Sequence, residues 1–342
     1  MKAIRTFATA AAGVGALLAG RAAMRRRNQM RFAGRSVVIT GGSRGLGLAL
    51  AREFAAEGGR LTLLARDPVE LEHARQSLVE QGAEVLTVPC DVRYRTEVAA
   101  AITRVINQYG RIDVLINNAG VIQVGPVEHM QVDDFMNAMA IHAWGPLYGM
   151  LAAIPHMREQ GGGRIVNIAS IGGKVAVPHL LPYSTSKFAL TGLSTGMRAE
   201  LAQDNILVTT VSPGLMRTGS HFNARFKGQH AAEFTWFALG DALPTDSIDA
   251  RKAAQQIVTA CRYGVPELTI TFQARLLVIV NALLPNTMAR LLTLVNRLLP
   301  APTTAEGDQS RSGRQSRSRL APSALTSLAD QAAEEYNELH GR

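Results

Sequence analysis

A glycine-rich turn between a short apolar strand and a helix constrains the fold of this chain more than any other feature. Residues 35–40 read as a buried strand, and a helical stretch over 48–57 follows the turn. Glycines at such a turn let the backbone approach a pyrophosphate, whose charge is stabilised by the amides at the helix N-terminus. The segment therefore predicts a dinucleotide site, with a plain flexible loop as the alternative. The residues expected to contact the dinucleotide here are Gly41, Ser43, Arg44, Gly45, Leu46 and Gly47.

Three polar residues further along the chain predict a proton-transfer site. Tyr183 and Lys187 are four positions apart, so on a helix they share one face. An ammonium beside a phenol favours the phenolate, and we therefore expect Lys187 to lower the pKa of Tyr183 from its usual value of about 10. Ser170, thirteen positions before Tyr183, can hold the oxygen that exchanges the proton. Tyr and Lys at this spacing can also simply flank a solvated helix, so the glycine turn upstream decides the interpretation.

The spacing T-G-x-x-x-G-x-G, taken with Ser170, Tyr183 and Lys187, resembles the classical short-chain dehydrogenase/reductase family over about residues 35–271. The resemblance implies an α/β fold with a Rossmann-type doubly wound parallel sheet in a single domain. It also implies an oxidoreductase that interconverts a carbonyl and an alcohol. Tyr183 would donate or accept the proton, Ser170 would orient the substrate oxygen, and Lys187 would tune Tyr183 and bind the nicotinamide ribose.

Further family motifs follow successive predicted strands, where ligands bind in open α/β sheets. Small residues after the strand 112–116 leave room for a ribose. The family places an adenine contact after the strand 84–89, and a turn beneath the nicotinamide with a hydroxyl contact to its carboxamide after the strand 206–211. Each motif could alternatively be an ordinary strand-ending turn. The residues concerned are Asp91 and Val92, then Asn118, Ala119 and Gly120, then Pro213, Gly214 and Thr218.

The charge that follows the second strand favours NADP(H) over NAD(H). An acidic residue at this position accepts the 2′-hydroxyl of NAD, whereas an arginine accommodates the 2′-phosphate of NADP. The strand 61–65 ends at Arg66, and Arg44 adds a second positive charge. Asp67 precedes Pro68 in a pattern typical of a helix N-terminus, so we assign it as a helix cap. NAD(H) remains the alternative, with both arginines as solvated surface charges.

The basic charge of the chain is concentrated at its N-terminus. Residues 1–31 contain seven of the Lys and Arg residues and no acid, which accounts for +7 of the formal +9. The rest is nearly neutral, so nucleic acid is not an expected partner. The apolar run 7–20 is shorter than the roughly 20 residues of a comfortable membrane helix, and the arginines after it disfavour secretion. It could be a signal-peptide core, a marginal anchor or an interfacial helix.

After the predicted catalytic domain, 32–271, the chain has three further regions. Residues 272–300 contain three arginines and no acid. The pattern of 286–299 predicts an amphipathic helix, which could lie on a membrane, cover a dimer interface or a substrate cleft, or pack onto the protein's own body. Residues 301–320, rich in Ser, Arg, Gly and Pro, predict a disordered linker. Residues 321–342 could form a terminal helix. With the N-terminal segment, this extension places the protein on the cytoplasmic side of a membrane, the cytoplasm being the alternative.

One position departs from the family pattern at the site. The family usually has an Asn three residues before a helix Gly, where its backbone holds a water that relays protons. Here that position is His142, three residues before Gly145. Either backbone geometry suffices and His142 is an ordinary helix residue, or its imidazole joins the relay near neutral pH.

The substrate is the least constrained part of the sequence. Residues 213–243 contain four of the ten Phe and one of the two Trp, which favours an apolar carbonyl or alcohol, although the aromatics could simply pack the lid. Cys90 and Cys261 are the only cysteines, so no disulfide framework is expected, and no pattern indicates a metal site. A second copy of the chain is a further candidate partner. The competing functional class is a non-catalytic NADP-binding scaffold or sensor.

Overall fold

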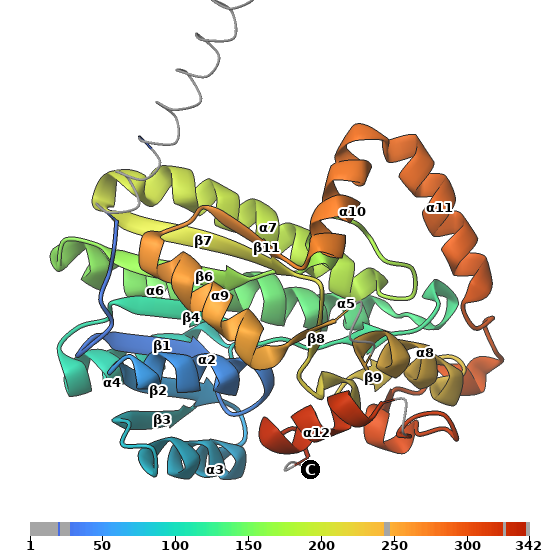
Figure 1. Cartoon of the computed structure of the whole chain (residues 1–342), viewed down its shortest axis with the longest axis horizontal. Coiled ribbons are helices and arrows are strands. Elements are labelled where there is room, and N and C mark those ends of the chain that lie inside the picture. Colours follow the sequence, from blue (N-terminus) through green and yellow to red (C-terminus); the bar gives the residue numbers. More distant parts are fainter. Residues whose placement is uncertain (1–19, 21–27, 243–246, 324–325, 340–342) are drawn as a thin grey trace, which may run out of the picture.

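A parallel sheet of seven strands forms the centre of the molecule (Figure 1). The computed structural model describes residue 20 and residues 28–242, 247–323 and 326–339. The strand order β3-β2-β1-β4-β6-β7-β11 reverses direction between β1 and β4, as in a doubly wound fold. The strands are β1 Ser36–Thr40, β2 Arg60–Ala65, β3 Val85–Pro89, β4 Val114–Asn117, β6 Gly163–Ile168, β7 Ile206–Pro213 and β11 Glu267–Ile270.

Helices cover both faces of this sheet and bury a separate core on each. One core joins the sheet to α2, α3 and α9, and the other joins it to α4, α6 and α7. Because both faces are buried, β1 and β6 are buried at every position. The helices are α2 Gly45–Ala56, α3 Pro68–Val79, α4 Arg95–Tyr109, α5 Val132–Met139, α6 Gly145–Glu159, α7 Leu181–Leu201 and α9 Ala250–Tyr263. The expected Rossmann-type α/β fold is confirmed.

Local sequence signals explain where several of these helices begin and end. Asp67 accepts hydrogen bonds from the amides of Val69 and Glu70 at the start of α3, and Pro68 is its first residue. The assignment of Asp67 as a helix cap is therefore confirmed. Helix α4 ends at Gly110, whose φ of 71° suits glycine. The N-terminal segment 1–31 lies outside the described residues except for residues 20 and 28–31.

A third apolar cluster lies beyond the carboxyl ends of the strands. It is built around α8, His230–Ala242, together with β5, Gln123–Val124, and β9, Arg225–Phe226. The pair β8, Leu215–Arg217, and β10, Ser247–Asp249, lies close by. The aromatic residues expected to cover the substrate are packed into this cluster, since Phe222, Phe226, Phe234 and Phe237 are all buried.

The C-terminal region differs from the expected linker. A disordered segment was predicted over 301–320, but the structure packs it against the body. Strand β12, Arg311–Ser312, pairs with β9, and the backbone amide of Thr303 donates to His129 Nε2 over 2.9 Å. Asp308 lies 2.7 Å from His129 Nδ1. The polar composition of 301–320 indicated disorder. It gave no sign of this packing, because the partners of these polar groups are distant in sequence.

Two helices after the sheet form a hairpin that stands away from the body (Figure 1). They are α10, Phe272–Leu283, and α11, Pro285–Leu298, which agrees with the amphipathic helix expected near 286–299. The hairpin leaves many apolar side chains exposed, and Phe272, Leu283 and Leu298 are 73–80 % accessible. Among the described residues, no helix has the length and apolar character needed to cross a bilayer.

Candidate active site

Ser170, Tyr183 and Lys187 meet at the carboxyl ends of β6 and β7. Ser170 follows β6 by two residues, and its hydroxyl accepts a hydrogen bond of 3.0 Å from the Gly172 amide. Tyr183 lies in the first turn of α7, where its ring packs beside Gly172. One turn later, the Lys187 ammonium donates to the Ile168 carbonyl over 2.8 Å and lies 5.6 Å from the centre of the Tyr183 ring. The three residues therefore form one cluster.

Burial dominates the electrostatics of this cluster. It raises the pKa of Tyr183 above its usual value; a hydrogen bond from Ser170 opposes the rise, and the charge of Asp241 adds to it. Burial also lowers the pKa of Lys187 to about 7. We expected Lys187 to lower the pKa of Tyr183, and the structure corrects this: the pKa rises, because desolvation of the buried phenol is the largest effect on it. Tyr183 therefore holds its proton at neutral pH.

His142 is buried behind Tyr183, and both of its ring nitrogens have protein partners. The Val121 amide donates to Nε2 over 3.0 Å, so Nδ1 bears the proton and donates to the Ser186 hydroxyl over 2.7 Å. Ser186 in turn donates to the carbonyl of Tyr183 over 2.8 Å. Burial lowers the pKa of His142 well below its usual value, and the charge of Lys187 adds to the effect. These contacts favour a positioning role over a proton relay.

The glycine-rich turn has the shape that a pyrophosphate requires. Gly41 and Gly45 have φ values of 64° and 56°, which side-chain-bearing residues rarely adopt. A Cβ on Gly47 would lie 2.0 Å from the carbonyl oxygen of Gly41, so only glycine fits there. Helix α2 begins after Arg44, which provides no side-chain cap for the first amides. This backbone fits the phosphates of a dinucleotide.

The charged residues near the second strand are divided between free and paired groups. Arg66 is exposed after β2, and its positive charge acts on the nearby Asp91 carboxylate. Arg44 is paired: its Nη1 lies 2.9 Å from Glu70 Oε1, and its Nε lies 3.5 Å from Glu338 Oε2. Asp67 is used as the helix cap. Of Arg44, Arg66 and Asp67, only Arg66 has no ion pair or cap contact in the described part of the chain. The 2′-substituent would therefore meet a positive charge.

The other motifs expected to contact a coenzyme lie along the same edge of the sheet. The Asn118 side chain donates to the carbonyls of Thr40 and Gly41, which ties the end of β4 to the glycine turn. Ala119 and Gly120 complete that strand end, with the Ala119 amide bonded to the Thr40 hydroxyl. Asp91 and Val92 follow β3, and the Asp91 carboxylate is paired with Arg93. Pro213 is the last residue of β7, and Gly214 and buried Thr218 follow it.

Comparison with known proteins agrees with this arrangement. The family described as "short chain dehydrogenase" matches residues 35–227. The chain belongs to the short-chain dehydrogenase family. A "Dehydrogenase/reductase SDR family protein 7-like" of Drosophila melanogaster is 32 % identical over 77 % of this chain and 80 % of its own. Its namesake in Anopheles gambiae is 37 % identical over 58 % of this chain, and the match spans just under two thirds, 64 %, of that protein.

A solved structure shares the fold of this short-chain dehydrogenase over most of its length. The L-sorbose reductase of Gluconobacter frateurii, solved with NADPH and L-sorbose, superposes with a TM-score of 0.64. It is 28 % identical, and the match covers 70 % of this chain and 97 % of the reductase. The family assignment places this chain among the short-chain oxidoreductases.

The sequence of this dehydrogenase did not predict two sets of residues near the site. The first lines a groove of about 450 Å³ between residues 125–128, residues 176–181 and residues 296–302, which include the last turn of α11. The second comprises residues 336–339, close to the C-terminus, which lie against the glycine turn. Neither has a local sequence pattern, because both arise from contacts between distant segments.

Proposed function

We propose that the chain is an NADP(H)-dependent oxidoreductase that interconverts a carbonyl and an alcohol on an apolar substrate. The observation that supports this most strongly is the convergence of Ser170, Tyr183 and Lys187 beside a turn shaped for a pyrophosphate. A scaffold that only bound a dinucleotide would need the turn and not the buried polar cluster. Bound NADP(H) would supply or accept a hydride at the substrate carbon.

The chain's own residues would manage the proton. In the reducing direction the Tyr183 hydroxyl gives its proton to the substrate oxygen as the carbonyl becomes an alcohol, and in the oxidising direction it takes the proton back. The Ser170 hydroxyl holds that oxygen. A raised pKa keeps Tyr183 protonated at neutral pH, which suits carbonyl reduction. Lys187 lies against the ring from the next turn of α7, where its positive charge can stabilise the phenolate that Tyr183 becomes when it gives up its proton.

The preference for NADP(H) is argued from charge. Arg66 is exposed where the 2′-phosphate would lie, and Asp67, the residue that could have bound a 2′-hydroxyl, is committed to the cap of α3. The related L-sorbose reductase was solved with NADPH. We expect NADPH to bind more tightly than NADH in a fluorescence titration, and a clear preference for NADH would reverse this assignment.

The groove that includes Leu181, two residues before Tyr183, supports an apolar substrate. Its lining includes Val127, Val177, Leu181 and Leu299. The buried aromatic residues of 213–243 pack its surroundings and do not themselves define the substrate. A screen of NADPH oxidation with long-chain, cyclic and aromatic ketones and aldehydes tests the proposal. Turnover of apolar carbonyls would support it, whereas coenzyme binding without turnover of any carbonyl or alcohol would favour the scaffold.

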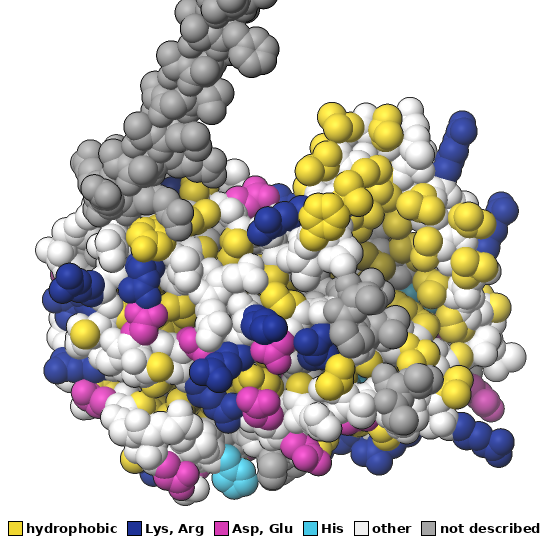
Figure 2. Space-filling view, viewed as in Figure 1, with side chains coloured by type: hydrophobic (Ala, Val, Ile, Leu, Met, Phe, Trp, Pro, Cys, Tyr) yellow, Lys and Arg dark blue, Asp and Glu magenta, His cyan; other side chains and the backbone are white. Residues whose placement is uncertain are grey.

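An anionic membrane surface is the proposed location, on its cytoplasmic side. The hairpin of α10 and α11 presents apolar side chains with three arginines and no acidic residue over 272–299. Figure 2 shows the apolar surface of this hairpin, with arginines along its margin. Such a surface suits the boundary between anionic headgroups and acyl chains. The exposed apolar residues are Phe272, Leu276, Ile279, Leu283, Leu284, Leu291, Leu294 and Leu298.

A further inference from the structure

The end of the chain folds back onto the edge of the sheet where the glycine turn lies. Helix α12, Ser327–Glu335, packs against α8 and β8 (Figure 1). Gly219 makes this approach feasible, because a Cβ at that position would lie 2.4 Å from the Cα of Ala333. Residues 336–339, here called the C-terminal segment, continue from α12 between the glycine turn and residues 218–223.

The backbone of the glycine turn is bonded to this segment. The Gly45 amide, at the first position of α2, donates to the carbonyl of Tyr336 over 2.8 Å. The Asn337 side chain donates to the carbonyl of Ser43 over 3.0 Å. The Arg52 guanidinium lies over the Tyr336 ring, 5.2 Å from its centre. A helix-terminal amide that would otherwise face a phosphate is thus already used.

Glu338 brings a carboxyl group to the same place. Its side chain is buried, and Oε1 would lie 2.5 Å from a Cβ built on Gly45, so it rests directly against that glycine. Asn223 Nδ2 donates to Oε2, and Arg44 Nε lies 3.5 Å from the same oxygen. Burial raises the pKa of Glu338, although Arg44 and Asn223 oppose the rise. Helix N-termini and arginines hold phosphates in the same way.

The segment continues from the turn toward the catalytic residues. Leu339 packs in the third apolar cluster, of which Tyr183 and Val177 are also part. The segment therefore follows the path expected for a bound dinucleotide, from the pyrophosphate position toward the nicotinamide. A coenzyme and this segment cannot share that space.

We propose that the C-terminal segment is a built-in competitor of the coenzyme, with the Glu338 carboxyl group in the pyrophosphate position, so that a dinucleotide binds only after the segment has moved. This inference rests on the proposed function, because it requires the glycine turn to be the coenzyme site. The chain should therefore bind NADPH more weakly than it would if the C-terminal segment lay outside the site.

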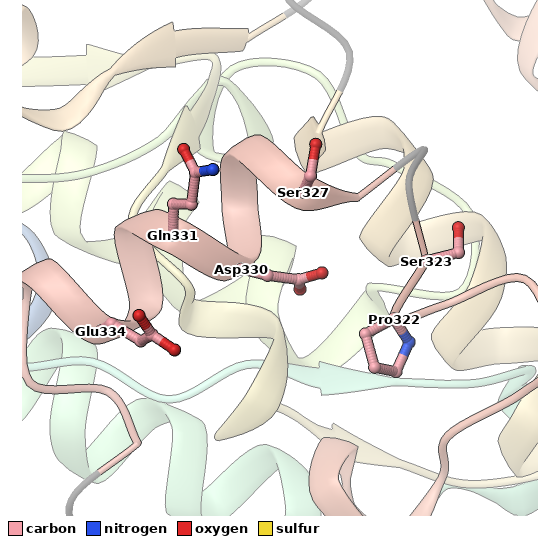
Figure 3. A pocket seen from close by; sticks show the side chains of 6 residues that line it. All are labelled: Pro322, Ser323, Ser327, Asp330, Gln331 and Glu334. Carbon is pink, nitrogen blue, oxygen red and sulfur yellow. The ribbon is translucent and has the colours of Figure 1, made fainter.

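The first test compares NADPH affinity among full-length variants. Removing the carboxyl group in Glu338→Ala should tighten NADPH binding by about tenfold, because the segment loses the pair with Arg44 and the hydrogen bond from Asn223 that hold it in place. Glu334→Ala is the matched control: this exposed residue of α12 lines a surface hollow with Ser327, Asp330 and Gln331 (Figure 3) and should not change the affinity. Weaker binding in Glu338→Ala would mean that the segment covers the coenzyme, which overturns the proposal.

The second test needs no substitution. Hydrogen exchange of the backbone amides at 336–339 in the unmodified protein should become faster when saturating NADPH displaces the segment. Slower exchange, or no change, would overturn the proposal. If the wild-type chain and Glu338→Ala bind neither NADPH nor NADH, the proposed function fails together with this inference. If both bind NADPH equally tightly, the proposed function stands and the inference fails.

Discussion

The structure favours one of the roles that the sequence left open for His142. Its position suggested either an ordinary helix residue or a member of a proton relay. Both ring nitrogens are engaged, and the bonded chain runs from Val121 through the imidazole and Ser186 to the backbone of Tyr183. The residue lies in a single π-helical turn, Ala140–Trp144, which precedes α6. Its geometry fits the positioning of Tyr183.

This role predicts a particular kinetic result. We expect His142→Ala to lower kcat by roughly tenfold to a hundredfold, because α7 loses a support that sets the position of Tyr183. The pH–rate profile should keep its shape, since an imidazole with a strongly lowered pKa does not titrate near neutrality. His142→Asn should stay active, because its amide still supplies a donor and an acceptor. A displaced profile in the Ala variant would instead indicate a relay, and an unaltered rate would remove any role.

Asp241 gives a prediction about stability and pH. Burial raises its pKa to about 7, from 3.8 for an exposed group, and its Oδ2 has no hydrogen-bond partner within the described part of the chain. Between those pH values the folded chain binds more protons than the unfolded chain, so the stability due to this group falls as pH rises from about 4 to 7. Asp241→Asn removes that loss.

We therefore expect Asp241→Asn to melt about 3 °C or more above the wild type at pH 8, with a smaller difference at pH 5. Thermal melts followed by circular dichroism at the two pH values would measure this. A variant that is equally or less stable at pH 8 would show that Asp241 is ionised and satisfied in the folded protein.

Among the elements, the hairpin of α10 and α11 has an apolar face that its sequence predicts but that packs against little of the described protein. The amphipathic pattern of 286–299 predicted a helix, and α11 forms there. Met288 is its one buried residue, so most of the apolar face has no partner among the described residues. The membrane proposal accounts for this exposed face.

Co-sedimentation with vesicles tests the hairpin. The full-length protein should bind vesicles of phosphatidylcholine with phosphatidylglycerol more than vesicles of phosphatidylcholine alone, because its charges there are positive. Leu283→Ser with Leu284→Ser should lower the bound fraction, the N-terminal segment providing the remainder. Val69→Ser with Val132→Ser, two exposed valines on α3 and α5, is the control and should have no effect. Equal binding of both double variants would contradict the proposal.

Across the whole molecule, the sequence predicted what depends on local pattern. The strand, turn and helix at the glycine motif formed as expected, and so did the cap at Asp67, because short-range hydrogen bonds and backbone conformation determine them. Ser170, Tyr183 and Lys187 came together because parallel strands end at one edge of the sheet. The fold class and the family followed from these features.

The rest could not be predicted because it depends on contacts between distant residues. Nothing local indicates that Glu338 meets Arg44, or that Thr303 bonds to His129. The polar composition of 301–320 suggested disorder, although its groups find partners in the body. The pKa of Tyr183 was expected to fall, and it rises because the depth of burial is a property of the folded molecule.

The kinetics of Tyr183→Phe show whether the Tyr183 hydroxyl is the proton donor. The substitution removes one hydroxyl and keeps the ring, so the variant should fold and bind NADPH with unchanged affinity. With the best carbonyl found in the screen and saturating NADPH, kcat should fall by about a thousandfold, within the range expected for loss of a general acid. A variant that keeps turnover within about tenfold of the wild type, while binding NADPH normally, would contradict the account, because Tyr183 would then not be the proton donor.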